Sequence, residues 1–170
     1  MIVWLIGLSG SGKTEVARSL REKIVALSKN CVFLDGDTIR ELLGNDLGHT
    51  LDDRRRNAYR ISRLCRYLDQ QGINVVFGVL SLFPENRSWN REHIVNYYEV
   101  FLDAPLPLLV ERDSKDLYRK ALSGKLKNVV GVDLAFPPPE SSDLTLVNDF
   151  TRSVGELAEI VLEKVKGRLH

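Results

Sequence analysis

The feature that most constrains the fold is the segment GLSGSGKT (residues 7–14), which follows the apolar run Ile2–Gly7. It matches the pattern G-x-x-x-x-G-K-[ST] in full and lies between an expected strand and an expected helix, as this phosphate-binding loop (P-loop) requires. Its glycines let successive backbone N–H groups converge on phosphate oxygens, and the helix N-terminus adds favourable partial charge. The predicted cofactor-binding residues of the loop are Gly7, Ser9, Gly10, Ser11, Gly12, Lys13 and Thr14.

Two side chains of this loop have predicted roles in binding ATP. Lys13 is expected to reach the β- and γ-phosphates as a catalytic cation, and Thr14 is expected to ligate Mg²⁺. The motif does not show what becomes of the triphosphate. The sequence contains no N-K-x-D element for guanine, and 170 residues are too few for a motor ATPase. A small-molecule kinase is the class that remains.

The chain alternates strand-like apolar runs with amphipathic segments of helical spacing. This pattern predicts a three-layer α/β/α P-loop NTPase fold with a five-stranded parallel sheet, most simply as one domain over residues 1–170. Strands are expected at 2–7, 31–35, 73–80, 98–103 and 144–149, and helices at about 13–27, 50–72, 106–112 and 154–166. The inner stripe of the first helix is expected to be Val16, Ala17, Leu20, Ile24 and Leu27.

The charge balance limits the partners of the chain. It has 24 basic and 23 acidic side chains, a formal net charge of +1, which predicts no broad face for nucleic acid or membrane. With no leader sequence and no apolar run of bilayer length, a cytoplasmic protein is expected. Cys31 and Cys65 lack the spacing of metal ligands and are expected to be buried free thiols.

The segment DGDTIR (residues 35–40) places two acids and a base where the second strand ends. Open α/β sheets bind ligands at the carboxyl ends of their strands, and a kinase needs a carboxylate near the incoming hydroxyl group. We therefore expect Asp35 to lie toward the metal, Asp37 toward the acceptor hydroxyl as a catalytic residue, and Arg40 one helical turn further. The alternative is that Asp37 only caps the helix that follows.

Four segments together resemble the adenylylsulfate (APS) kinases in order and spacing: GLSGSGKT, DGDTIR, NDLGHTLDDRRRNAYRI and RDSKDLYRKALSGKLKNVVGVD. The resemblance spans nearly the whole chain. It implies phosphoryl transfer from MgATP to the 3′-hydroxyl of a small-molecule nucleotide acceptor with a modified 5′-phosphate. It also implies a homodimer and a lid at about residues 113–130, with Arg112 near the adenine of ATP. The acceptor-binding residues that it implies are Asp37, Arg40, His49, Arg54, Asn57, Ser81, Lys127 and Val129.

Helical spacing supports two of these residues independently of the resemblance. Arg54 and Asn57 are three positions apart near the start of the expected second helix, so they share one of its faces. Arg55 and Arg56 are expected to be solvated.

The departures from the APS kinases cluster at the acceptor base. Aromatic residues that sandwich the acceptor adenine in the family are replaced by His49 and Val129, which removes about 1–3 kcal/mol of stacking each. Leu82, Pro84 and Leu122 replace a proline, an arginine and a further cation of the family pattern. The segments ENRSWNRE and KNVVGVD resemble a sub-branch found with capsule-modification genes, whose members act on cytidine diphosphoramidate. We therefore expect cytidine diphosphoramidate as the acceptor.

Two alternatives stay open. One is a true APS kinase of sulfate assimilation, which makes PAPS with a drifted acceptor pocket. The other is a sensor that binds nucleotide without turnover, and the joint presence of Lys13, Thr14 and Asp37 argues against it.

Overall fold

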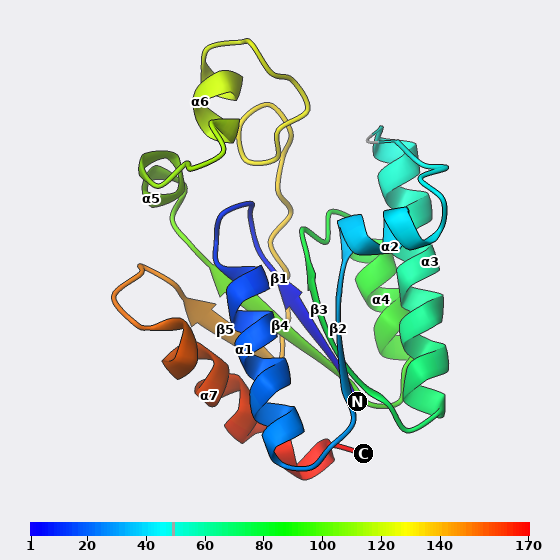
Figure 1. The fold of residues 1–170 in the computed structure, drawn as a ribbon. Helices are drawn as coiled ribbons and strands as arrows, with labels where there is room; N and C mark the ends of the chain where they lie inside the picture. Colours follow the sequence, from blue (N-terminus) through cyan, green and yellow to red (C-terminus); the bar gives the residue numbers. More distant parts are fainter. Residues whose placement is uncertain (49) are drawn as a thin grey trace.

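Five parallel strands form the central sheet in the order β2-β3-β1-β4-β5, which confirms the predicted fold class (Figure 1). The computed structural model describes residues 1–48 and 50–170. The strands are β1 (Ile2–Ile6), β2 (Cys31–Asp35), β3 (Asn74–Val79), β4 (Tyr97–Asp103) and β5 (Leu144–Val147).

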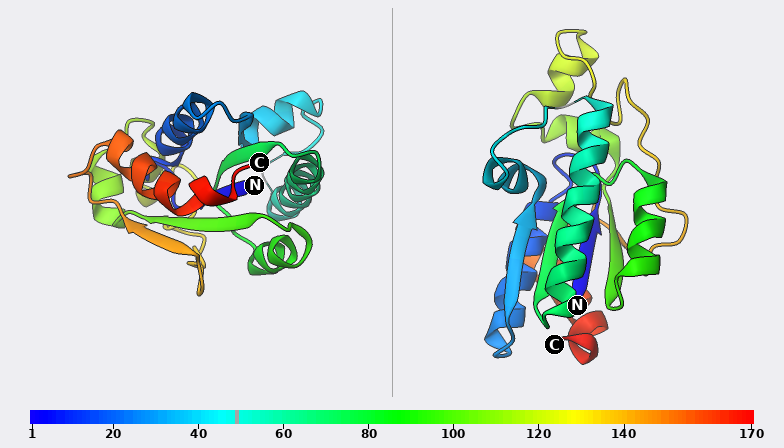
Figure 2. Two further views of the ribbon diagram at one scale, coloured as in Figure 1. Left: turned by 90° about the horizontal axis from the view of Figure 1, so that it is seen from below. Right: turned by 90° about the vertical axis from the view of Figure 1, so that its right-hand side faces the viewer.

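Helices cover both faces of this sheet (Figures 1 and 2). They are α1 (Lys13–Ala26), α2 (Gly36–Leu42), α3 (Leu51–Gln70), α4 (Pro84–His93), α5 (Leu106–Glu111), α6 (Leu117–Leu122) and α7 (Val154–Val165), and the 3₁₀ turn η1 (Lys166–Arg168) follows α7. Helices α1 and α7 pack on one face, and α3 and α4 on the other, while α5 and α6 lie beyond the carboxyl ends of the strands.

Strand β1 lies at the centre of the sheet and divides the core into two layers. Its side chains alternate between the faces, so Val3 and Leu5 join the hydrophobic cluster under α1 and α7. Ile2, Trp4 and Ile6 join the cluster under α2 and α3. No residue of β1 is more than 1% exposed, as expected for a parallel strand that is covered on both faces.

Helix α3 has the boundaries that its sequence predicts. The hydroxyl oxygen of Thr50 accepts a hydrogen bond from the backbone N–H of Asp53 at 3.2 Å and so caps the first turn. At the other end, Gly72 has a φ of 72°, which is the left-handed conformation that commonly ends helices.

Not every local expectation is correct. Leu27 does not belong to the inner stripe of α1, because it follows the last turn of the helix and is 49% exposed. Arg55 is exposed, as expected, and its guanidinium also lies 4.9 Å from the ring of Phe83 and 3.3 Å from a carboxylate oxygen of Glu85. Helix α4 was not expected, although its first residue, Pro84, is well tolerated at that position.

The expectations about membrane spans and about the two cysteine thiols can be compared with the described residues. There, no helix has both the length and the apolar character that a membrane span needs. Cys31 and Cys65 are both free thiols, but only Cys65 is fully buried. Burial raises the pKa of the Cys65 thiol to about 12, so it stays protonated at neutral pH.

The difference in burial between Leu20 and Leu27 predicts different effects of their substitution on stability. Leu20→Ala removes a fully buried side chain from the cluster between α1 and α7 and should lower the free energy of unfolding by about 2–5 kcal/mol. Leu27→Ala, the matched control on the exposed end of the helix, should change it by less than about 0.5 kcal/mol. Urea denaturation followed by circular dichroism measures both, and equal losses would contradict this packing.

Candidate active site

A cleft of about 1260 Å³ lies at the carboxyl ends of the strands, with the P-loop on one side and α2 and the start of α3 on the other. It therefore occupies the edge of the sheet at which open α/β folds bind ligands. The predicted site residues that line it are Ser9, Gly10, Gly12, Lys13, Thr14, Asp35, Asp37, Arg40, Arg54, Asn57, Ser81 and Arg112. Residues up to 103 positions apart in the sequence thus meet in one cavity.

The other predicted site residues do not line this cleft. Gly7 and Ser11 are buried in the loop itself, and Lys127 is exposed elsewhere. Val129 is 4% exposed and packs in a hydrophobic cluster with Leu109, and Leu109 but not Val129 lines the cleft. The prediction for His49 falls outside the described residues.

The P-loop backbone is held in place by the close approach of Gly7 to β4 and by two hydrogen bonds from residues distant in the sequence. A Cβ atom on Gly7 would lie 2.6 Å from the carbonyl oxygen of Leu102, so only glycine fits there. The Asn148 side-chain amide donates to the carbonyl oxygen of Ser11 at 3.0 Å. The Tyr118 hydroxyl group donates to the carbonyl oxygen of Ser9 at 2.7 Å.

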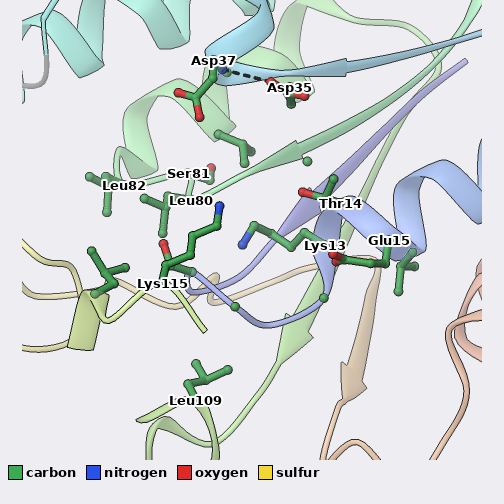
Figure 3. A pocket seen from close by; sticks show the side chains of 18 of the residues that line it. Lys13, Thr14, Glu15, Asp35, Asp37, Leu80, Ser81, Leu82, Leu109 and Lys115 are labelled. Atoms are coloured by element: carbon green, nitrogen blue, oxygen red, sulfur yellow. Dashed lines mark hydrogen bonds between the residues drawn. The ribbon is translucent and has the colours of Figure 1, made fainter. Parts of the chain in front are cut away.

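Lys13 begins α1 and extends into the cleft (Figure 3). Its amine donates to the carbonyl oxygen of Leu8 at 2.6 Å. Burial lowers the pKa of the Lys13 ammonium from 10.5 to about 8. An anionic ligand such as a phosphate group would reverse this shift, because it favours the charged form.

Asp35 and Asp37 have different local roles at the end of β2. One carboxylate oxygen of Asp35 accepts hydrogen bonds from the backbone N–H groups of Asp37 at 3.1 Å and Thr38 at 2.8 Å, so Asp35 is the N-cap of α2. The side chain of Asp37 is 92% exposed and faces the cleft, where Arg40 lies 3.3 Å from it (Figure 3). The alternative that Asp37 only caps the helix is therefore wrong.

Beyond Asp37, polar groups of α2 and α3 form the end of the cleft farthest from the P-loop. The Asn57 amide nitrogen donates to the carbonyl oxygen of Gly36 at 3.4 Å. Burial, followed by the charge of nearby Arg40, lowers the pKa of Arg54. Among the described residues, the buried atoms without a hydrogen-bond partner include Nε of Arg40 and Oδ1 of Asn57.

Ser81 lies just after β3 in a strained backbone conformation, with a φ of 54°. Its hydroxyl oxygen accepts a hydrogen bond from the indole N–H of Trp4 at 3.4 Å. Its carbonyl oxygen accepts one from the buried guanidinium of Arg87 at 2.7 Å. The surrounding structure therefore holds this turn in place at the edge of the cleft.

On the P-loop side, the guanidinium of Arg112 stacks over the ring of Phe150 at 4.2 Å, and both residues line the cleft. The sequence predicts a role for Arg112 but not for Phe150, Asn148 or Tyr118. A signal for Asn148 existed, since it is a polar residue directly after the apolar run of β5. The sequence gives no comparable signal for Tyr118, whose partner is 109 positions away.

The P-loop and an exposed carboxylate thus face each other across one cleft, so a triphosphate and a second substrate can meet there. This arrangement defines the class of P-loop kinases.

Comparison with known proteins identifies the family. A family model for adenylylsulphate kinase matches residues 1–147. The cytidine diphosphoramidate kinase of Campylobacter jejuni is 38% identical over 164 residues, which are 96% of this chain and 95% of that protein. The adenylyl-sulfate kinase of Deinococcus deserti is 40% identical over 148 residues, 87% of this chain and 82% of that protein. The chain therefore belongs to the adenylylsulfate kinase family, whose members are ATP-dependent kinases.

A solved structure agrees with this assignment. The Mycobacterium tuberculosis APS kinase in complex with AMPPNP and APS superimposes with a TM-score of 0.89 at 35% identity. The superposition covers 97% of this chain and 96% of that chain.

The lowered pKa of Lys13 predicts proton uptake on nucleotide binding. In the free protein, Lys13 loses its proton as the pH rises through about 8, and a bound phosphate restores the charged form. AMPPNP binding should therefore take up protons at about pH 9 but hardly any near pH 7, and the affinity should fall above about pH 8. Titration calorimetry in buffers of different ionisation enthalpy measures this uptake. Uptake that is equal at both pH values, or that persists in Lys13→Met, would contradict the assignment.

Proposed function

We propose that this chain transfers the γ-phosphoryl group of MgATP to the 3′-hydroxyl of a nucleotide whose 5′-phosphate is modified. The observation that carries the proposal is the cleft with a P-loop at one end and unpartnered polar atoms at the other. A buried donor, Nε of Arg40, and a buried acceptor, Oδ1 of Asn57, each cost free energy unless a ligand pairs with them. A nucleotide offers both phosphate oxygens and ribose hydroxyl groups as partners.

Mg²⁺ fits the donor groups beside the P-loop. Thr14 offers a hydroxyl oxygen and Asp35 a carboxylate, and both line the cleft. Mg²⁺ typically takes one or two such protein ligands and completes its shell with water and phosphate oxygens. Among the described residues, no group of three or more His, Cys, Asp or Glu side chains could hold a metal ion. When bound, Mg²⁺ would neutralise charge that develops on the phosphates.

Asp37 is the residue we assign to the acceptor hydroxyl group. Because its carboxylate is exposed toward the cleft, it can orient the hydroxyl and accept its proton during transfer. Arg40 and Arg54 carry positive charge beside it, which suits an acceptor with anionic phosphates. Membership of a kinase family disfavours the alternative of a sensor without turnover.

For the acceptor itself, we propose cytidine diphosphoramidate, and with it a role in capsule modification. The Campylobacter jejuni relative named for this activity aligns over 96% of the chain. The lack of aromatic residues at positions 49 and 129 also disfavours the adenine sandwich of the APS kinases. Residues 113–130 as a lid and a homodimer are further parts of the proposal.

APS is the second candidate acceptor, because the Deinococcus deserti adenylyl-sulfate kinase is 40% identical over its aligned 148 residues. The sequence identities to the two relatives, 38% and 40%, are too similar to favour either substrate.

Replacing the carboxylate of Asp37 tests its assignment. Asp37→Asn keeps the shape of the side chain but cannot accept the hydroxyl proton, so kcat should fall on the order of 10²–10⁴-fold with little change in ATP affinity. Stopped-time assays of ADP release give kcat, and calorimetry gives the affinity for AMPPNP. An unchanged kcat would show that Asp37 does not act on the acceptor.

A panel of acceptors tests the substrate. The kcat/KM for cytidine diphosphoramidate should exceed that for APS, and CDP- and UDP-linked compounds serve as further comparisons. If kcat/KM for APS equals or exceeds that of every pyrimidine acceptor, the protein is an APS kinase with an altered pocket. The cytidine proposal would then be abandoned and the 3′-kinase proposal kept.

A further inference from the structure

Lys115 is a cation in the cleft to which neither the P-loop motif nor the predicted acceptor set assigns a role. It lies between α5 and α6 and lines the same cavity as Lys13 and Leu80. Figure 3 shows its side chain extending into the cleft toward the amine of Lys13. Two lysine side chains therefore converge on the space where the terminal phosphate of a bound triphosphate would lie.

The carboxylates next to Lys115 in the sequence are already engaged. Asp113 accepts hydrogen bonds from the backbone N–H groups of Leu117 at 2.9 Å and Arg119 at 3.0 Å, and these bonds lower its pKa. Asp116 pairs with the guanidinium of Arg119 at 2.5 Å. Lys115 itself makes no hydrogen bond or ion pair with any residue in the described part of the chain. Its charge thus remains available to an anionic ligand.

The segment that carries Lys115 is also held against the P-loop. Tyr118, three residues further on, is 2% exposed and donates its hydroxyl hydrogen bond to the carbonyl oxygen of Ser9. Burial raises the pKa of Tyr118 to about 12, so the hydroxyl keeps its proton at neutral pH. Tyr118 also packs with Leu109 and Ala121 in the hydrophobic cluster beside the cleft. Lys115 is therefore positioned relative to the phosphate-binding backbone and not on a free loop.

We propose that Lys115 is a catalytic residue that binds the transferred phosphoryl group from the side opposite Lys13. In the transfer, the bond between the γ-phosphorus and the β–γ bridging oxygen breaks, and ADP leaves with that electron pair. A bond from the acceptor oxygen to phosphorus forms, and the hydroxyl proton goes to Asp37. Negative charge is spread over three equatorial oxygens in the transition state, and two cations stabilise it better than one. This inference rests on the ATP-dependent kinase activity of the family and not on the identity of the acceptor.

The test compares Lys115→Ala with Lys120→Ala, a matched control at an exposed position of α6 that does not line the cleft. Lys115→Ala should lower kcat on the order of 10²-fold, while Lys120→Ala should stay within about twofold of the wild type. Lys115→Arg should recover a large part of the activity. The Kd for ADP, which has no γ-phosphate, should be unchanged in all three variants, and a larger Kd for AMPPNP is expected only in Lys115→Ala.

The assay uses the acceptor that gives the highest rate with the wild-type protein. If no acceptor in the panel is phosphorylated, basal ATP hydrolysis is measured instead. The test of Lys115 therefore does not depend on the identity of the acceptor. A Lys115→Ala variant with the kcat of Lys120→Ala would overturn the inference. A weaker affinity for ADP in Lys115→Ala, with an equal loss in Lys115→Arg, would also overturn it, because it would mean that the substitution only disturbs the packing of the segment.

Discussion

The site depends first on how the P-loop backbone is held against the end of β1. At Gly7 the chain passes so close to the Leu102 carbonyl group that no Cβ atom would fit. Asn148 and Tyr118 then bind two carbonyl oxygens of the loop from distant parts of the sequence. With its carbonyl groups engaged in this way, the loop can present successive N–H groups to phosphate oxygens. Phosphate binding is thus built on tertiary contacts as well as on the glycine pattern.

The order of the strands explains why the second substrate meets this loop. Strand β1 is central, and β2, which ends in Asp35, lies two positions away at the edge of the sheet. All strands are parallel, so their carboxyl ends share one edge, and α2 and α3 bring Asp37 and Asn57 to the same cleft. The proposed transfer takes place between Lys13 and Asp37, which line the same cleft.

Features determined by local sequence could be predicted. The P-loop, the cap at Thr50 and the polar segment after β2 all arise from neighbouring residues, and the buried β1 follows from its continuous apolar run. Helix α4 was missed because it is polar and begins with a proline in a segment that resembled a loop. Tyr118 and Asn148 act across 109 and 137 positions, respectively, and no local pattern reports such contacts. Val129, for which the family pattern suggests an acceptor role, packs in a hydrophobic cluster with Leu109 and Tyr118, and no local pattern in the sequence predicts these partners.

In the proposed function, ATP binds at the P-loop end, the acceptor binds at the α2–α3 end, and the terminal phosphoryl group goes to the 3′-hydroxyl group of the acceptor ribose. The position of the new phosphate can be measured directly by ¹H–³¹P correlation NMR of the product, using the acceptor with the highest turnover. The expected spectrum has one new phosphorus resonance coupled to H3′ of the ribose, with one ADP formed per product. Inorganic phosphate as the sole product, or coupling of the new phosphorus resonance to H2′ or H5′, would contradict this account of the cleft.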